Sequence, residues 1–277
     1  MPVLRPLLLQ TDKKGNTILH IALSQGHKDL VPVVKSVYST ETLVKALMIK
    51  NVNGFSPMQG AIGKSQMKYQ PHNIAKFVEE LPAQTRMEVL SQSVSQSVTS
   101  TLGKIQFRHI NRIDHEGETL IHTVIACENW ETYLRTLLPV FSNTEIYKLL
   151  SIQNRAGETP LHLAARKFGI FEVLLSTLTE LAAYPSTVDD GTSALLTLLG
   201  KQNVIGETVV HKAAGYEPET VVPALKLLHQ VELIDLLTIL NHHGETAILE
   251  AVLMRNVSFL ESILEIFEAK AFNPSHS

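Results

Sequence analysis

The sequence predicts an all-α solenoid of about six helix-pair repeats, with an extra short helix in each repeat. Three observations support this class. A motif that reads Gly-Glu-Thr, two further residues and then His recurs along the chain. An Asp or Asn stands three residues before the glycine of every copy. Apolar segments of helical length separate the copies. Such recurrence is typical of repeat proteins, in which each unit buries its apolar face only against its neighbours.

The motif has six copies of unequal strength. The strongest occupy residues 117–122, 157–162 and 206–211, and an earlier copy at 15–20 has Asn in place of Glu. Two weaker copies occupy residues 54–59 and 244–249. The preceding acidic or amide residues are Asp12, Asn51, Asp114, Asn154, Asn203 and Asn241.

Residues 154–169 show why each motif residue is present. Asn154 and Gly157 bracket a tight turn, because an amide side chain can accept nearby backbone N–H groups and glycine tolerates positive φ. Thr159 then suits the N-cap of a helix, and Pro160 suits its first position, where a missing N–H costs nothing. Gly169 fits a left-handed position that closes this helix, and an apolar second helix is predicted over 171–178.

The pattern resembles the ankyrin repeat over nearly the whole chain. The matching residues of the best copy are Asn154, Gly157, Thr159, Pro160, Leu161, His162, Ala164 and Ala165. The resemblance is strong in repeats one, three, four and five and weak in two and six. It implies a stack of helix pairs that binds a partner protein through turn tips and the exposed side of each first helix, which together form a concave face.

The repeats are longer than the family period of about 33 residues, and we predict that a short third helix fills the difference. Repeats start near 12, 51, 114, 154, 203 and 241, and one solenoid covers residues 1–277. Third helices are predicted at 41–48, 145–150, 192–199 and 231–237, with a capping box from Ser142 to Glu145 before the second of them. The polar insertion 91–101 is predicted to be a surface loop, and residues 271–277 a tail.

Composition excludes several classes of function. The net charge is −3 with no basic block, which argues against a nucleic-acid partner. Cys127 is the only cysteine, so neither a disulfide framework nor a cysteine-based zinc site is available within one chain, and a cytoplasmic location is expected. No apolar run reaches the ~18 residues of a membrane span. Residues 1–9 are interpreted as an edge segment, and the chain is expected to be a monomer.

The residues that could carry chemistry have structural interpretations. His20, His122, His162 and His211 share one repeat position, where the resemblance implies a bond to the cap Thr. His242 and His243 stand together at a turn tip, and Cys127 has no evident nucleophile partner. We therefore predict no catalytic, metal or cofactor site.

For the motif glutamates and for two aromatic residues, the sequence leaves two interpretations open. Glu118, Glu158, Glu207 and Glu245 precede the cap residues, where they either form an acidic rail or only favour the positive end of a helix dipole. Trp130 and Tyr133 are either partner anchors or core residues.

The repeats and the absence of a predicted catalytic site together predict that the chain is a non-catalytic adaptor that binds a partner protein. Carried over by position, the candidate tip residues are Lys13, Lys14, Val52, Asn53, His115, Glu116, Arg155, Ala156, Val204, Ile205, His242 and His243. The exposed first-helix candidates are Ser24, Gln25, Arg166 and Lys167. The alternatives are an enzyme whose site is built on the insertion and concave face, or a structural scaffold. Long degenerate repeats, with Glu261, Glu265 and Glu268 near the C-terminus, also resemble ankyrin effectors that intracellular bacteria deliver into the host cytosol.

Overall fold

A computed structural model describes residues 8–25, 30–62, 70–91, 117–183, 193–216 and 220–272, and every element in them is helical. Most of the predicted insertion, from residue 92 onward, lies outside these ranges, as do Asp114, His115 and Glu116. The chain divides into two compact units, Met1–Glu145 and Ile146–Ser277, which are described separately.

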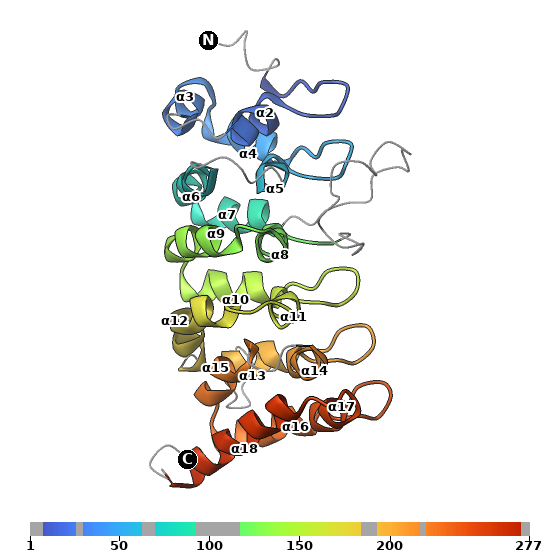
Figure 1. The fold of residues 1–277 in the computed structure, drawn as a ribbon. Coiled ribbons are helices and arrows are strands. Elements are labelled where there is room, and N and C mark those ends of the chain that lie inside the picture. The colour runs from blue at the N-terminus through green and yellow to red at the C-terminus, as the bar shows by residue number, and fades with distance from the viewer. Residues whose placement is uncertain are drawn as a thin grey trace. The chain divides into compact units, whose positions relative to one another are not determined.

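Unit 1 contains three helix pairs, each made of a first and a second helix (Figure 1). The first helices are α2 (Ile18–Gln25), α5 (Pro57–Ile62) and α8 (Leu120–Ala126). The second helices are α3 (Leu30–Val37), α6 (Gln70–Glu80) and α9 (Trp130–Leu137), followed by the 3-10 helix η2 (Leu138–Val140). Third helices are α4 (Thr40–Met48), α7 (Ala83–Leu90) and α10 (Asn143–Ser151), the last of which contains the boundary between the units.

Unit 2 repeats this plan with three more helix pairs. Its first helices are α11 (Pro160–Ala164), α14 (Val209–Gly215) and α17 (Ala247–Leu253). Its second helices are α12 (Ile170–Ala182), α15 (Val222–Leu227) and α18 (Val257–Phe272), and its third helices are α13 (Ala194–Leu199) and α16 (Gln230–Thr238).

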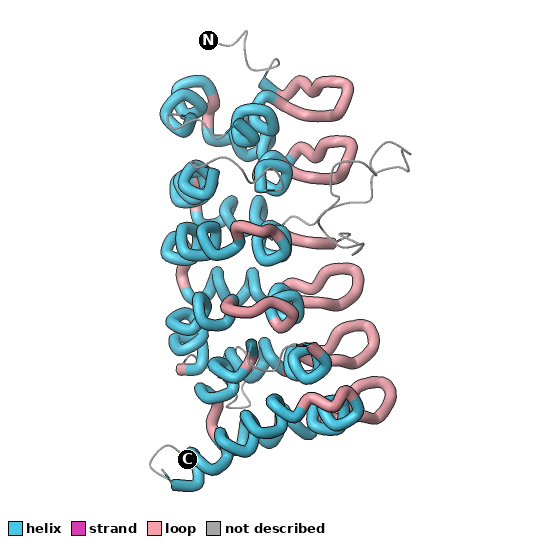
Figure 2. The backbone as a smooth tube through the Cα atoms, in the orientation of Figure 1, coloured by secondary structure: helices cyan, strands magenta, loops and turns pink. Residues whose placement is uncertain are grey.

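Helices of one kind stack on helices of the same kind. In unit 1, α5 lies between α2 and α8, and α6 lies between α3 and α9. In unit 2, α14 lies between α11 and α17, α15 between α12 and α18, and α13 packs on α16. In Figure 2 the loops that lead into α11, α14 and α17 lie in a row beside those helices. The core of each unit is built from the leucines, valines and alanines on the facing sides. The predicted all-α solenoid of six helix pairs is confirmed.

The predicted turn is formed by its amide residue and its glycine. The Asn203 side-chain oxygen accepts the backbone N–H of Ile205 at 3.0 Å and that of Glu207 at 2.9 Å. The backbone N–H of Gly206 bonds to the Asn203 carbonyl at 3.0 Å, and Gly206 has a φ of 79°. A side chain would be strained at that φ, so glycine is required there.

The motif Thr and His form a buried cap that also joins successive repeats. The Thr159 N–H donates to Nδ1 of His162 at 3.1 Å, so Nε2 carries the ring proton and donates to the Glu207 carbonyl at 3.1 Å. Gln59 replaces the histidine in repeat two with the same geometry, because its Oε1 accepts from the Ser56 N–H and its Nε2 donates to a carbonyl of the next repeat. The structural interpretation of the motif histidines therefore agrees with their contacts.

The third helices occur where the sequence predicted them. The Ser142–Glu145 capping box is present, with the Ser142 N–H donating to Glu145 Oε2 at 2.9 Å and the Glu145 N–H donating to Ser142 Oγ at 3.3 Å. Sequence analysis missed α7, because its segment AQTRMEVL has little apolar periodicity. Helix α18 extends through Phe272, two residues into the predicted tail.

We expect Thr159→Ala to lower the free energy of unfolding by about 1 kcal/mol, the usual effect of losing an N-cap side chain. The Thr159 hydroxyl is buried and lies 2.8 Å from His162 Nδ1. Urea unfolding of this variant beside Thr238→Ala, an exposed threonine on α16, measures the difference. Equal midpoints for the two variants would contradict the cap assignment.

Candidate functional site

The turn tips of unit 2 form a row that we call the tip row, made of the pairs Arg155–Ala156, Val204–Ile205 and His242–His243. All six residues are exposed. One backbone hydrogen bond joins each tip to the next. The Val204 N–H donates to the Ala156 carbonyl at 3.1 Å, and the His242 N–H donates to the Ile205 carbonyl at 3.0 Å. Backbone hydrogen bonds therefore fix the position of the tips.

Two glutamines strengthen this connection, and sequence analysis missed them. Gln153 Nε2 donates to the Gly157 carbonyl at 2.6 Å and to the Gln202 carbonyl at 2.8 Å. Gln202 Nε2 donates in the same way to Gly206 at 2.7 Å and to Leu240 at 2.8 Å. The signal was present in the sequence, since each glutamine directly precedes the turn asparagine of its repeat.

The other predicted contact residues differ in their exposure to solvent. In unit 1, the tip residues Lys13, Lys14, Val52 and Asn53 are exposed, whereas His115 and Glu116 lie outside the described residues. Gln25 is exposed, and Arg166 and Lys167 are half-buried.

The prediction that Ser24 is exposed is wrong. It is 6% exposed, because its position on α2 turns toward the core, and its hydroxyl is satisfied by the Ile21 carbonyl at 2.8 Å.

A group of charged side chains in unit 2 forms ion pairs that the sequence did not predict. We call Glu158, Arg166, Glu207, Lys212 and Glu250 the charge cluster. Arg166 Nη2 bonds to Glu158 Oε1 at 2.7 Å, and Lys212 Nζ lies 3.6 Å from the same oxygen. Lys212 also pairs directly with Glu207. The ion pairs of the cluster therefore connect the fourth and fifth repeats, and Glu250 adds a nearby charge from the sixth.

The environment separates the pKa values of two carboxyl groups in this cluster. Burial raises the pKa of Glu207, but hydrogen bonds from Lys212 and Asn203 and the charge of Lys212 outweigh it, so the pKa is lowered. Burial, together with the charges of Glu207 and Glu245, raises the pKa of Glu250 to about 7 despite the opposing charge of Lys212. Glu207 is thus ionised at neutral pH while Glu250 is close to half-protonated.

The motif glutamates do not form an exposed acidic rail. Glu118 and Glu158 are 2% and 5% exposed, and Glu207 is engaged by Lys212. Tyr133 is a core residue at 1% exposure, which settles its alternatives in favour of packing, and Trp130 is half-buried. Cys127 is buried.

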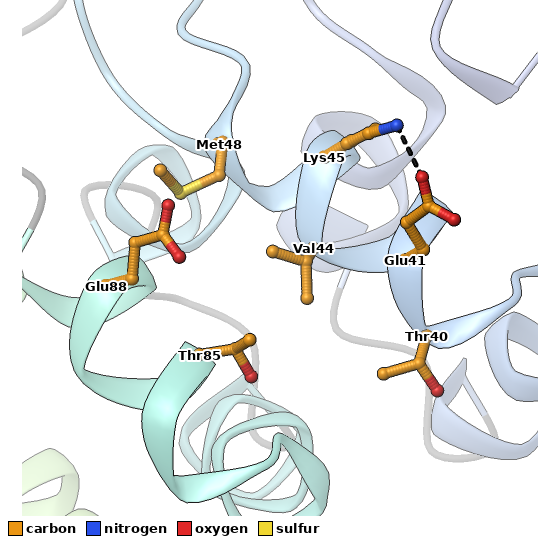
Figure 3. Close-up of a pocket in the computed structure, with 7 residues that line it drawn as sticks. All are labelled: Thr40, Glu41, Val44, Lys45, Met48, Thr85 and Glu88. Carbon is orange, nitrogen blue, oxygen red and sulfur yellow. Dashed lines mark hydrogen bonds and ion pairs between the residues drawn. The ribbon is translucent and has the colours of Figure 1, made fainter.

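A groove of about 650 Å³ in unit 1 is a second candidate (Figure 3). Val44 and Met48 on α4 line it opposite Thr85 and Glu88 on α7. The charged pair on its α4 side is already satisfied, since Lys45 Nζ lies 2.6 Å from Glu41 Oε1. The residues that line this groove provide a contact surface and no nucleophile with a base beside it.

The described segments contain neither a metal-binding cluster nor a membrane-spanning helix. Within them, no three His, Cys, Asp or Glu side chains converge so that they could hold a metal ion. None of the described helices is both long and apolar enough to cross a bilayer.

Comparison with known proteins agrees with the repeat geometry. The family model for the ankyrin repeat matches residues 156–180, which include the tip residue Ala156, α11 and most of α12. A chain in the structure of the predatory endopeptidase Bd0816 from Bdellovibrio bacteriovorus in complex with immunity protein Bd3460 is similar with a TM-score of 0.50 and 15% identity. That match covers 92% of this chain and 99% of the other. The ankyrin repeat domain of Bcl-3, a member of the IkappaB family, has a TM-score of 0.41 and 21% identity over 86% of this chain and 95% of that one. Curated protein sequences gave no match.

The stacked helix pairs, the Asn–Gly turns and the buried Thr–His caps define the class as an all-α repeat protein. The family match over the fourth repeat identifies residues 156–180 as an ankyrin repeat. Ankyrin repeats are protein-interaction modules.

Proposed function

We propose that this chain is a non-catalytic adaptor that binds a partner protein through the tip row and the adjoining face of α11, α14 and α17. The observation that carries this proposal is the exposure of two apolar side chains at one turn tip. Val204 is 60% exposed and Ile205 is 45% exposed. The alternative, that this tip folds down and is buried, disagrees with those values.

The bonds that hold the Val204–Ile205 tip in place come from the backbone and from Asn203. The turn around Asn203 and Gly206 uses backbone atoms and the Asn203 side chain, and its bonds to neighbouring turns also use the backbone. Two branched apolar groups in water give no benefit to folding, whereas exposed apolar groups at a rigid position can contribute to an interface. The same positions differ in every repeat, which supports a role in specificity.

The proposal is tested with the double variant Val204→Ser and Ile205→Ser. A partner is first captured from lysate with the wild-type chain, and its Kd is then measured by calorimetry with purified proteins. We expect the double variant to raise the Kd at least tenfold, which corresponds to about 1.4 kcal/mol. We expect its melting temperature to be unchanged.

A matched control is available on another surface of unit 2. Val231 and Ile234 on α16 are 69% and 45% exposed, so Val231→Ser with Ile234→Ser removes equal apolar exposure away from the tip row. The control is expected to leave the Kd unchanged. If both pairs weaken binding equally, or if the tip variant lowers the melting temperature and leaves the Kd unchanged, the tip row is not the interface.

We propose the cytosol as the place where this adaptor acts. A sole cysteine that is buried is compatible with a reducing compartment. The effector setting stays a prediction from the sequence. Glu261, Glu265 and Glu268, which contributed to it, lie exposed along α18.

A further inference from the structure

The charge cluster of unit 2 contains one more carboxylate than it can neutralise. Glu158 is bound by Arg166 and lies within reach of Lys212. Glu207 is bound by Lys212 and by the Asn203 side-chain amide at 2.9 Å. Arg166 and Lys212 are thereby paired with Glu158 and Glu207, and Glu250 forms no ion pair within the cluster.

Glu250 is placed as an acceptor without a donor. Its Oε2 atom is buried and has no hydrogen-bond partner. An uncompensated buried carboxylate oxygen is costly. The pKa of Glu250 is raised for the same reason, because burial and the charges of Glu207 and Glu245 disfavour its ionised form.

Gly215 keeps the space in front of the Glu250 carboxylate open. A Cβ at Gly215 would lie 3.2 Å from Glu250 Oε1 and 4.0 Å from its Cδ, and among the described residues, its own chain neighbours and helix backbone apart, no other atom would lie within 4 Å. The residue at the end of α14 therefore leaves room beside the carboxylate where any other residue would fill it. This space lies in front of Oε1, the second oxygen of the carboxylate whose Oε2 has no partner.

Two exposed side chains lie near Gly215 and Glu250 along the chain. Tyr216 follows Gly215 directly, is 61% exposed, and its ring already stacks with Arg166, whose Cζ lies 5.4 Å from the ring centroid. Met254, 60% exposed, lies one turn after Glu250 on the same side of α17. Aromatic faces beside a carboxylate favour a cationic group with an apolar stem.

We propose that the charge cluster is the docking site for one Lys or Arg side chain of the partner protein, with Glu250 as its counter-ion and Tyr216 and Met254 around its stem. The proposal rests on the proposed function, because it assigns the chemistry of a partner contact on the same face. A cation supplied by the partner at Oε1 would compensate the charge of Glu250, which the charges of Glu207 and Glu245 otherwise disfavour.

The test uses peptides in place of the unidentified partner. A phage-displayed library of random 12-residue peptides is selected on the full chain. We expect the selected peptides to share a Lys or Arg next to apolar residues. For one such synthetic peptide, the Kd is measured by fluorescence polarisation with wild type and with Glu250→Gln. The variant is expected to raise the Kd about tenfold, and changing the peptide's basic residue to Gln should then cost little more. Such non-additivity identifies the two groups as a pair.

Two further measurements separate docking from a structural role. The wild-type Kd should be about tenfold lower at pH 8 than at pH 6, because the cation needs ionised Glu250, and Glu250→Gln should abolish this dependence. Gly215→Ala should raise the Kd without lowering the melting temperature, since it blocks the opening and improves helix propensity. Glu261→Gln removes an equal charge from the exposed side of α18 and should change neither quantity.

Selected peptides without a shared basic residue, or a selection that returns no binder, would overturn the inference. Equal affinity of a basic peptide for wild type and Glu250→Gln would overturn it as well. These outcomes are distinct from failure of the proposed function, which is tested separately by the tip variant and the captured partner.

Discussion

Replacing Gly157 with Ala is expected to lower the free energy of unfolding by about 3 kcal/mol or more, whereas the same change at Gly244 is expected to cost about 1 to 2 kcal/mol. Both glycines stand at the same turn position with nearly equal φ values of 70° and 76°. A Cβ at Gly157 would lie 2.7 Å from the Val204 nitrogen and 2.9 Å from Cα of Asn203. At Gly244, nothing would lie within 4 Å.

This pair separates two effects that usually occur together. The strain of a left-handed alanine is common to both variants, and the collision with the backbone of the next turn occurs only at Gly157. Guanidinium unfolding of the two variants measures each loss. Equal losses would mean that the turns are not stacked as closely as these distances require.

Replacing His162 with Ala is expected to lower the free energy of unfolding by about 3 kcal/mol, because a buried ring with two hydrogen-bonded nitrogens leaves both a cavity and unsatisfied partners. The partners left behind are the Thr159 N–H and the Glu207 carbonyl. His243→Ala at an exposed tip is the control and should change stability by less than about 0.5 kcal/mol. A small effect at His162 would contradict its assigned role.

The same histidine makes stability depend on pH. Burial lowers the pKa of His162 to about 4 in the folded chain, against about 6.5 when unfolded. Between these values the unfolded chain binds the extra proton, so the stabilisation is present above pH 6.5 and is lost as the pH falls toward 4. The loss amounts to about 3 kcal/mol at most. Burial lowers the pKa values of His20 and His211 in the same direction.

Comparing wild type with His162→Ala between pH 7 and pH 4 isolates this contribution. Other groups, such as Glu250 with its raised pKa, act with the opposite sign but are common to both proteins. The difference in unfolding free energy between the two should shrink as the pH falls. A constant difference would show that His162 titrates normally in the folded chain.

The fold was predictable because its signals are local. An asparagine, a glycine, a cap threonine and a histidine at fixed spacing determine one turn and one helix start, and the turn at Asn203 and Gly206 has the bonds that the residue types imply. Helix lengths were less predictable. Leu181 of α12, which lies beyond the predicted end at residue 178, is buried, and a one-dimensional pattern does not show where a neighbouring helix ends.

The site was predictable only in part, because it depends on contacts between repeats. Sequence position made Ser24 an exposed candidate, but burial depends on how the helix is turned toward the core. Lys212 and Glu250 each stand one residue after the motif histidine position. In the fourth repeat that place is taken by Leu163. Charged residues at a position that is uncharged in the first four repeats were a usable signal. The sequence alone does not show that neighbouring repeats bring Lys212 and Glu250 near each other, so this signal could not be assigned to a site.

The hydrogen bonds from Gln153 and Gln202 to the next turn give successive repeats of unit 2 the same kind of connection. Gln153 and Gln202 both donate to the carbonyl of the residue that directly precedes the next turn asparagine. The acceptor is a backbone atom, so this joint does not depend on which side chain the following repeat presents there. A chain built with such joints can gain or lose a whole repeat by recombination and keep its register. Evolution can therefore vary the length of the array separately from the identity of its tip residues.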